Sequence, residues 1–190
     1  IVRPGMRPEQ ASMLTLIMGL AVASACRSLF ELDAQIKWPN DIVIGGKKLC
    51  GILTEMSAEM NEIHYLVIGT GINVNMEEFP MEIRDTATSL CLELGKKVRR
   101  ADVIQRCLEY FEQYYDVFME TENLSRLQKL YNQLLVSRDR QVRVLTPGNE
   151  YQGISRGIND KGELLVERED GKTEAVYAGE VSVRGIYGYS

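Results

Sequence analysis

The chain changes character near residue 136, and this change constrains the possible fold more than any single motif does. Up to that point, long helical stretches alternate with apolar runs of the β type. Beyond it, short strand-like runs are divided by turn-forming Pro, Gly, Asn and Asp and lie at residues 141–145, 151–158, 163–169 and 174–183. Four or five short strands in about 50 residues predict a small β-barrel. We therefore predict two units, residues 1–136 and 137–190.

The first unit is expected to begin with a buried helix and to continue as a sheet. The helix should run from about Pro8 to Leu29, because apolar residues recur there at helical spacing with few polar positions between them. Gly45 and Gly46 separate two strand-like runs and predict a hairpin, since both residues accept positive φ. The runs that we expect to form strands lie at residues 34–38, 42–44, 48–56 and 63–69.

Two further helices are expected, at residues 101–119 and near residues 124–135. Both carry apolar residues at helical spacing, which we interpret as core-packing faces without any cofactor role. The stripe on the first of them consists of Ile104, Cys107, Leu108, Phe111, Tyr115 and Phe118. A loop with Pro80 is expected before this helix.

Composition narrows the class of protein. With 45% hydrophobic and 26% charged residues, the 190-residue chain is typical of a folded globular protein rather than a disordered one. Its net charge of −5 is spread along the chain and gives no global basic footprint, so the chain itself is not expected to bind nucleic acid, although a local basic site for a small anionic ligand stays possible. The most apolar stretch, residues 13–25, is shorter than the roughly 20 residues of a membrane span and predicts a buried helix instead of membrane insertion.

The cysteines and the single histidine form no metal motif. Cys26, Cys50, Cys91 and Cys107 are well separated, without a CxxC pair, and His64 is the one histidine. Such spacing is not typical of a zinc site. It suits reduced thiols, which predicts a cytoplasmic protein, and it leaves disulfides open as an alternative.

Two clusters combine a lysine with a strand end or a glycine. Lys37-Trp38-Pro39-Asn40-Asp41 joins a cation, a large ring and two polar side chains, although alone it is more typical of a surface turn with Trp38 in the core. Lys48 precedes an apolar strand that contains Gly51. A glycine in a strand often marks close approach by a ligand, and a lysine over such a surface can neutralise a phosphate or a developing oxyanion. Alone, a lysine beside a hairpin is more often simply solvated.

A third cluster, Gly69-Thr70-Gly71-Ile72-Asn73, ends a β-type run and lets the backbone come close to a ligand. It lacks the third glycine of a dinucleotide-binding fingerprint and the Gly-Lys-Ser/Thr of a P-loop. Taken alone, it therefore indicates a ligand only weakly.

In this order and spacing, the three clusters resemble the biotin protein ligase family. The likeness continues in Thr88-Ser89-Leu90 and, within the second unit, at residues 153–158 and 179–184, so it covers essentially the whole chain. The family has an α/β catalytic domain, a mixed sheet with flanking helices related to class II aminoacyl-tRNA synthetases, followed by an SH3-like barrel. The order of elements expected above agrees with that fold.

The resemblance implies an ATP-dependent ligase. Members of this family join biotin to ATP, which gives biotinyl-5′-adenylate, and then transfer the biotinyl group to a lysine of a biotin carrier domain, such as that of acetyl-CoA carboxylase or a related carboxylase. The implied small molecules are therefore biotin, ATP and Mg²⁺. The implied partner is the carrier domain, and a homodimer is a further option.

The resemblance also assigns roles to residues. Lys48 corresponds to the lysine beside the biotin carboxylate and the adenylate phosphate, and Asp41 is a second catalytic candidate that would hold Mg²⁺ or position the incoming lysine. The residues assigned to biotin are Lys48, Gly51, Leu53, Gly69 and Gly71. The residues assigned to the nucleotide are Lys37, Asn40, Ile72, Asn73, Glu180 and Arg184. By residue type alone, the last two are equally typical of charges on a barrel surface.

Part of the family pattern is not found in the sequence. Ile1-Val2-Arg3-Pro4 resembles the end of a strand that follows the family's glycine- and arginine-rich loop, and that loop, the Thr-Asn-Gln-type biotin segment and a winged helix are missing from these 190 residues. We therefore expect a fragment that makes little adenylate alone. Two other interpretations stay open: a lipoate ligase relative of the same fold, and a module that senses biotin or its adenylate and controls dimerisation or DNA binding.

Overall fold

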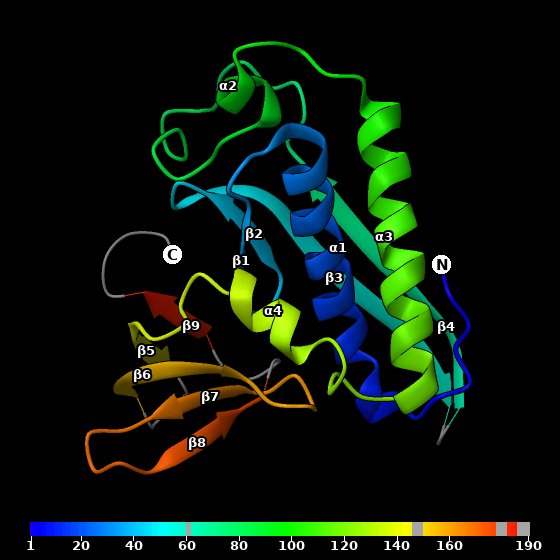
Figure 1. Ribbon diagram of the computed structural model, residues 1–190, viewed down its shortest axis with the longest axis vertical. Helices are drawn as coiled ribbons and strands as arrows, with labels where there is room; N and C mark the ends of the chain where they lie inside the picture. The colour runs from blue at the N-terminus through cyan, green and yellow to red at the C-terminus, as the bar shows by residue number, and fades with distance from the viewer. Residues whose placement is uncertain (60–61, 146–149, 178–181, 186–190) are drawn as a thin grey trace.

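Two antiparallel sheets and a layer of helices make up the protein (Figure 1). The computed structural model describes residues 1–59, 62–145, 150–177 and 182–185, the last of these by their backbone alone. In chain order the elements are η1 (Pro8–Gln10), α1 (Ser12–Phe30), β1 (Gln35–Lys37), β2 (Asp41–Ile44), β3 (Lys47–Glu59), β4 (Glu62–Ile72), α2 (Leu90–Leu94), α3 (Arg100–Thr121), α4 (Gln128–Leu134), β5 (Gln141–Leu145), β6 (Tyr151–Ile158), β7 (Leu164–Glu167), β8 (Thr173–Val176) and β9 (Ser182–Gly185).

The first sheet has the strand order β1-β2-β3-β4, and all of its neighbouring strands are antiparallel. Gly45 and Gly46 form the turn between β2 and β3 with φ of 55° and 77°, which confirms the predicted hairpin. Parallel pairing within the described residues is limited to two isolated bridges, Ile36 with Leu135 and Lys48 with Ala87. The α/β class predicted for this unit is confirmed.

Helix α1 is the centre of the core. Twelve of its residues are buried, because one side packs on the sheet and the others meet α3 and α4. At Gly19, which has no side chain, the helix approaches the side chains of Ile36, Ile42 and Ile52 from three strands. The stretch Pro8–Phe30 is long and apolar enough to cross a membrane by length and composition alone, and is thus longer than the apolar run seen in the sequence. Of its most apolar window, 67% is buried inside the protein, as predicted for a core helix.

The second sheet has the strand order β8-β7-β6-β5-β9. The single run expected at residues 174–183 is in fact two strands, β8 and β9, which lie at opposite edges of this sheet. The strands predicted at residues 141–145 and 151–158 are found with those bounds. This confirms the small barrel-type sheet expected after the helices.

The helices differ from expectation in three respects. The apolar stripe of α3 was interpreted as entirely core-packing, but Ile104 and Leu108 are 56% and 55% exposed, so that part of the prediction was wrong. The rest of the stripe does face the core: Cys107 and Phe118 are buried, Phe111 and Tyr115 pack against the core, and Val103, which lies beside the stripe, is buried as well. Helix α4 begins at Gln128, later than expected, and α2 was not predicted at all.

The two sheets are tied together at Trp38, which is 3% exposed. Its indole Nε1 donates a hydrogen bond to the carbonyl oxygen of Gly162, in the turn between β6 and β7, at 3.0 Å. A side chain at Gly162 would come within 2.5 Å of Leu16 of α1, so this turn packs directly on the core helix. The backbone N–H of Val136 also donates to the carbonyl oxygen of Ile36.

Replacing Trp38 with phenylalanine is expected to lower the free energy of unfolding by about 1–3 kcal/mol. The phenylalanine ring fills most of the same space, but the buried carbonyl of Gly162 loses its donor. Urea unfolding followed by circular dichroism measures the change. An unchanged free energy of unfolding would show that this hydrogen bond does not stabilise the contact between the sheets.

Candidate active site

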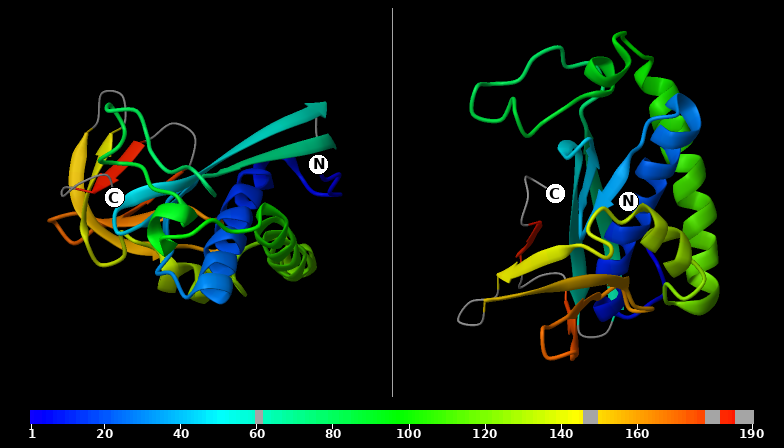
Figure 2. Two further views of the ribbon diagram at one scale, coloured as in Figure 1. Left: turned by 90° about the horizontal axis from the view of Figure 1, so that it is seen from above. Right: turned by 60° about the vertical axis from the view of Figure 1, so that its left-hand side comes forward.

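One face of the first sheet carries the residues assigned to ligands. Ile36, Ile42 and Ile52 point toward α1, so the neighbouring positions along each strand point to the other face. The register places Lys37, Asp41, Gly51 and Gly71 side by side in one row across β1, β2, β3 and β4. In Figure 2, α1 and α3 lie together on one side of β3 and β4, and no helix of the described chain covers the other side. The row therefore lies on a face that a ligand can reach.

Glycines keep this face flat beside the row. Gly71 lies opposite Gly51, and Gly69 lies opposite Leu53. A Cβ atom at Gly69 would lie 3.4 Å from the carbonyl oxygen of Leu53, and one at Gly71 would lie 3.6 Å from that of Gly51. Leu53 itself is 65% exposed and forms the apolar border of the surface. The residues predicted to bind biotin are thus brought together. We call the flat surface made by Gly51, Gly69, Gly71 and Leu53 the glycine floor.

A β-bulge turns Lys48 toward this floor. Ile42 pairs with Cys50 while the next residue, Val43, pairs with Lys48, so Leu49 is an extra residue in β3. Strict alternation would put Lys48 and Gly51 on opposite faces, and the bulge cancels that difference. The Lys48 Nζ atom lies 2.6 Å from Oδ1 of Asp41. Bulges of this kind are known to redirect a side chain next to a functional site.

Gly51 lies directly under the ammonium group. A Cβ atom there would be 3.1 Å from both Cε and Nζ of Lys48, and 3.6 Å from Oδ1 of Asp41. The Lys48 side chain is 38% exposed and that of Asp41 is 13% exposed, so the ion pair is half-covered by protein and half-open. Lys48, Asp41 and Gly51 thus form one arrangement, in which a positive charge is held over the floor but stays accessible.

A segment far along the chain fixes the backbone of Lys48. Its N–H donates to the carbonyl oxygen of Thr86 at 2.8 Å, and its carbonyl accepts from the N–H of Thr88 at 2.9 Å. Thr88 and Ser89 are buried, and the Ser89 hydroxyl caps α2 by accepting from the N–H of Leu92. The contribution of residues 86–88 was missed from the sequence, although the Thr88-Ser89-Leu90 motif was a signal for it.

Asn40 and Asn73 hold the site together through their amides. The Asn40 side chain donates from Nδ2 to the backbone carbonyl oxygen of Ile52 at 2.9 Å. The backbone carbonyl oxygen of Asn40 accepts a hydrogen bond from the N–H of Ile52. The Asn73 side chain donates from Nδ2 to the carbonyl oxygen of Thr88 at 3.1 Å. Its backbone N–H donates to the carbonyl oxygen of Leu49. Both side chains therefore connect the strands to the segments around Lys48.

The remaining residues predicted to bind the nucleotide are spread out. Lys37 lies in the row next to Asp41. Ile72 pairs with buried Cys50 and packs against the hydrophobic core. Arg184 lies on β9, where its backbone pairs with Arg143. Glu180 lies outside the described residues. The structure thus brings Lys37 to the row of ligand residues, while contacts of Ile72, Arg184 and Glu180 with a nucleotide stay predictions.

The thiols of the described chain do not form a metal centre. All four cysteines are free and buried. Burial raises the pKa of Cys26 to about 12 and that of Cys107 to about 11, and it also raises the pKa of Cys50, so these groups stay neutral thiols at neutral pH. Among the described residues, no three side chains of His, Cys, Asp or Glu gather as ligands for a metal ion.

Comparison with family models gives two matches that fit the two sheets. Residues 2–73 match the biotin/lipoate A/B protein ligase family, and residues 139–184 match the biotin protein ligase C terminal domain. The first match contains the floor, Lys48 and Asp41. The second contains β5 to β8 and most of β9.

Curated relatives match almost the whole chain. The bifunctional ligase/repressor BirA of Bacillus subtilis is 37% identical over 96% of this chain and 56% of its own length. The biotin–[acetyl-CoA-carboxylase] ligase of Mycobacterium tuberculosis is 34% identical over 92% of this chain and 64% of its own length. The chain thus spans somewhat more than half the length of the curated relatives it matches.

Solved structures match in fold as well as in sequence. The biotin protein ligase from Aquifex aeolicus superposes with a TM-score of 0.82 and 30% identity, over 94% of this chain and 77% of that protein. The same enzyme solved in complex with biotin and ATP gives a TM-score of 0.81. The chain is 30% identical to a solved biotin protein ligase over 77% of that protein, and it also matches the two family models. The chain therefore belongs to the biotin protein ligase family.

Proposed function

We propose that the protein containing this chain is an ATP-dependent biotin ligase that activates biotin as biotinyl-5′-adenylate and transfers it to a lysine of a carrier domain. The observation that carries the proposal is the Lys48 ammonium, held by Asp41 above the glycine floor on an uncovered sheet face. The geometry suits a small, largely apolar ligand with a carboxylate at one end.

The two steps need the same positive charge. In the first, a carboxylate oxygen of biotin attacks the α-phosphorus of ATP and pyrophosphate leaves. In the second, the acceptor amine attacks the biotinyl carbonyl carbon, and AMP leaves with the electron pair of the broken bond while the amine loses a proton. Negative charge builds on oxygens next to the reacting centre each time, and a positioned ammonium stabilises it. Lys48 is therefore assigned to stabilising charge, and the attacking amine belongs to the acceptor.

Different residues along the row are assigned to the two parts of the proposed ligand, biotin and the nucleotide. Gly51, Gly69, Gly71 and Leu53 would contact biotin, because they make the flat and apolar part of the surface. Residues near the other end of the row, including Lys37 and Asn40, would lie toward the nucleotide, together with Ile72, Asn73, Glu180 and Arg184.

Asp41 has two proposed roles. It would orient the Lys48 ammonium, which lies 2.6 Å from its Oδ1 atom, and it would either position the incoming acceptor lysine or hold Mg²⁺. Magnesium needs few protein ligands when it arrives with ATP phosphates, and one carboxylate such as Asp41 would then be enough. The described side chains fit that arrangement better than a metal site built from protein alone.

Several finer assignments follow from the relatives. One of them is named for acetyl-CoA carboxylase, so we infer that the acceptor is the biotin carrier domain of that enzyme or of a related carboxylase. Free, buried cysteines suit a reducing compartment, which supports a cytoplasmic location. Lipoate as the substrate is less favoured, because residues 139–184 match a domain named for biotin protein ligases.

Transfer of radiolabelled biotin tests the proposal. The protein containing these residues is incubated with labelled biotin, ATP and a biotin carrier domain, and label in the carrier is counted after gel electrophoresis. We expect ATP-dependent labelling that disappears when the target lysine of the carrier is replaced by arginine. A parallel thermal-shift series with biotin and lipoate identifies the preferred acid. No labelling of any carrier domain would overturn the proposal.

A further inference from the structure

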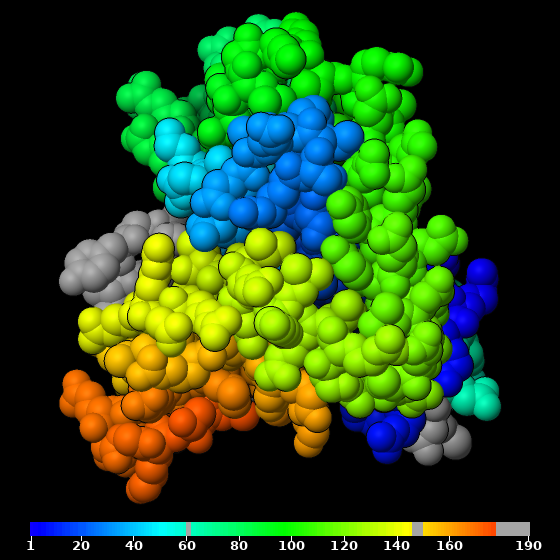
Figure 3. All heavy atoms as spheres, viewed as in Figure 1, coloured from blue at the N-terminus to red at the C-terminus, as the bar shows by residue number. Residues whose placement is uncertain are grey.

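The stretch between β4 and α2 returns to the hairpin of β2 and β3 and ends beside Lys48. Figures 1 and 3 show this stretch and α2 at the top of the molecule, next to that hairpin. Ala87 forms a parallel bridge with Lys48. The N–H of Lys48 donates to Thr86 and its carbonyl oxygen accepts from Thr88. Both backbone hydrogen-bonding groups of Lys48 are thus bound by one short segment, residues 86–88.

This segment stands where a regular sheet partner of Lys48 is missing. Within the described strands, the pairing of β3 with β4 begins at Cys50, so residues 86–88 take the place of a strand beside Lys48. On its other side Lys48 meets β2 at the bulge, where the pairing shifts between Ile42 and Val43. A bulge disrupts the ladder locally, so β2 alone holds Lys48 less firmly than a regular strand would. The position of Lys48 therefore depends on residues 86–88.

The side chains next to this contact are buried although they are polar. Within the described residues, the buried polar side chains are those of Thr88, Ser89 and Ser155, and two of these are neighbours here. A buried hydroxyl costs free energy unless it finds a partner. Thr88 Oγ1 donates to Oε1 of Glu93 in α2 at 2.5 Å, and Ser89 Oγ donates to the carbonyl oxygen of Met76 at 2.5 Å. These bonds give the segment one defined position.

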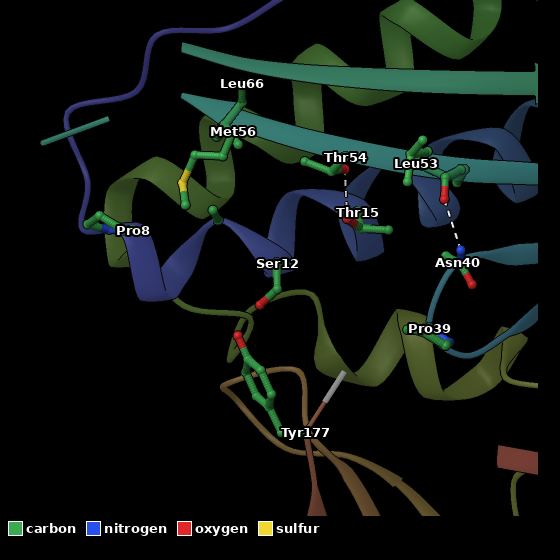
Figure 4. A pocket seen from close by; sticks show the side chains of 12 residues that line it. Pro8, Ser12, Thr15, Pro39, Asn40, Leu53, Thr54, Met56, Leu66 and Tyr177 are labelled. Atoms are coloured by element: carbon green, nitrogen blue, oxygen red, sulfur yellow. Dashed lines mark hydrogen bonds between the residues drawn. The ribbon is translucent and has the colours of Figure 1, made fainter. Parts of the chain in front are cut away.

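Thr88 is bonded to three parts of the chain at once. Its N–H donates to Lys48 in β3, and its carbonyl oxygen accepts from the Asn73 side chain, directly after β4. Its hydroxyl is the third point, at Glu93. Further along β3, the Asn40 side chain binds Ile52 in the same way from the other side (Figure 4). The part of β3 that carries the ammonium is therefore fixed at both of its ends.

We propose that Thr88 is a positioning residue for Lys48, and that Glu93 acts through Thr88 by holding its hydroxyl. This inference rests on the proposed function, since it concerns the reaction in which Lys48 stabilises charge. In this assignment neither Thr88 nor Glu93 touches a ligand. Both affect the rate through the position of the Lys48 ammonium alone.

Three variants test the assignment. Thr88→Val removes the hydroxyl and keeps the size of the side chain, Thr88→Ser keeps the hydroxyl, and Glu93→Ala removes its acceptor from an exposed position. Because Glu93 is exposed, its variant keeps the test valid even if Thr88→Val does not fold. Each variant is made in the protein containing these residues, once with Lys48 present and once together with Lys48→Ala.

ATP–pyrophosphate exchange and single-turnover transfer from synthetic biotinyl-5′-adenylate are measured for each protein. With Lys48 present, we expect Thr88→Val and Glu93→Ala to lower kcat for both steps by about tenfold, since a displacement of about 1 Å can cost about 10²-fold. The KM values for biotin and ATP should hardly change, and Thr88→Ser should keep most of the rate. Together with Lys48→Ala, none of the three should lower the rate further, because the group that they position is gone.

Ser155→Ala is the matched control. Ser155 is also fully buried, and its hydroxyl lies 3.3 Å from that of Ser137 in the second unit. This variant should lower the melting temperature without changing either rate.

Two results would overturn the inference. One is a loss of equal size with and without Lys48, because Thr88 would then support the fold or contact a ligand independently of Lys48. The other is a normal rate in both Thr88→Val and Glu93→Ala. If the wild type shows neither exchange nor transfer, the proposed function itself fails, and this is seen before any variant is made.

Discussion

Replacing Lys48 with alanine is expected to lower the rates of both adenylate formation and biotinyl transfer by about 10²–10³-fold, the loss typical when one positioned charge-stabilising group is removed. The side chain is 38% exposed and its ammonium pairs with Asp41, so the fold should survive. The rates are measured as ATP–pyrophosphate exchange and as single-turnover transfer from synthetic biotinyl-5′-adenylate. Using the synthetic adenylate shows the second step even when the first has become slow.

The neighbouring Lys47 supplies the control. It lies one residue earlier in β3 and is exposed, on the hairpin turn, so Lys47→Ala removes the same charge from nearly the same place in the sequence. We expect wild-type rates for that variant. If Lys48→Ala and Lys47→Ala lowered the rates equally, or if only the KM for ATP rose, charge stabilisation by Lys48 would be refuted.

Gly51→Ala is expected to lower the rate of adenylate formation by about 10²-fold, because displacement of a reacting group by about 1 Å can cost that much. The new methyl group would lie 3.1 Å from the Lys48 Nζ atom and 3.6 Å from Oδ1 of Asp41, so the ammonium must move from its place over the floor. Lysine is flexible and can move without disturbing the core, so the melting temperature should hardly change. Exchange kinetics and thermal unfolding together separate these two effects.

Gly5→Ala is the matched substitution, since a Cβ atom at Gly5 meets no atom within 4 Å. It should leave both the rate and the melting temperature unchanged. A Gly51→Ala variant with normal exchange would mean that the position of the ammonium in the structure is not the one used in the reaction.

The resemblance named the residues of the row, and short-range signals in the sequence explain why they lie side by side. The two glycines of the hairpin set the pairing of β2 with β3, and that pairing puts Asp41 opposite Gly51. Strand alternation then places Gly71 on the same face. Each of these relations depends on neighbouring residues along a strand, so a motif can carry it.

The orientation of Lys48 depends on relations that a motif does not carry. Its direction comes from the extra residue Leu49, and simple alternation would have turned the lysine toward α1. Its backbone is held by Thr86 and Thr88, almost forty residues away in the chain. Resemblance to a family could name the residue, but the bulge and the long-range hydrogen bonds appear only in three dimensions.

Helix α3 shows the opposite error. Its stripe was a correct observation of periodicity, but periodicity does not say which members of an apolar face are covered by the core. The structure buries Cys107 and Phe118 of the stripe, together with Val103 beside it, and leaves Ile104 and Leu108 largely exposed. Packing against α1 determines which residues of the stripe are covered, and the sequence of α3 alone does not contain that information.

The bond between Trp38 and Gly162 has a consequence for communication within the molecule. Trp38 lies between Lys37 and Asn40 in the covalent chain, so the residue that fastens the second sheet belongs to the same short segment as two ligand candidates. A change in the tilt of the barrel must therefore shift that segment, and a ligand that clamps the segment must in turn restrain the barrel. Thermodynamic linkage makes this influence mutual. If one orientation of the barrel strengthens ligand binding by a given free energy, ligand binding stabilises that orientation by the same free energy.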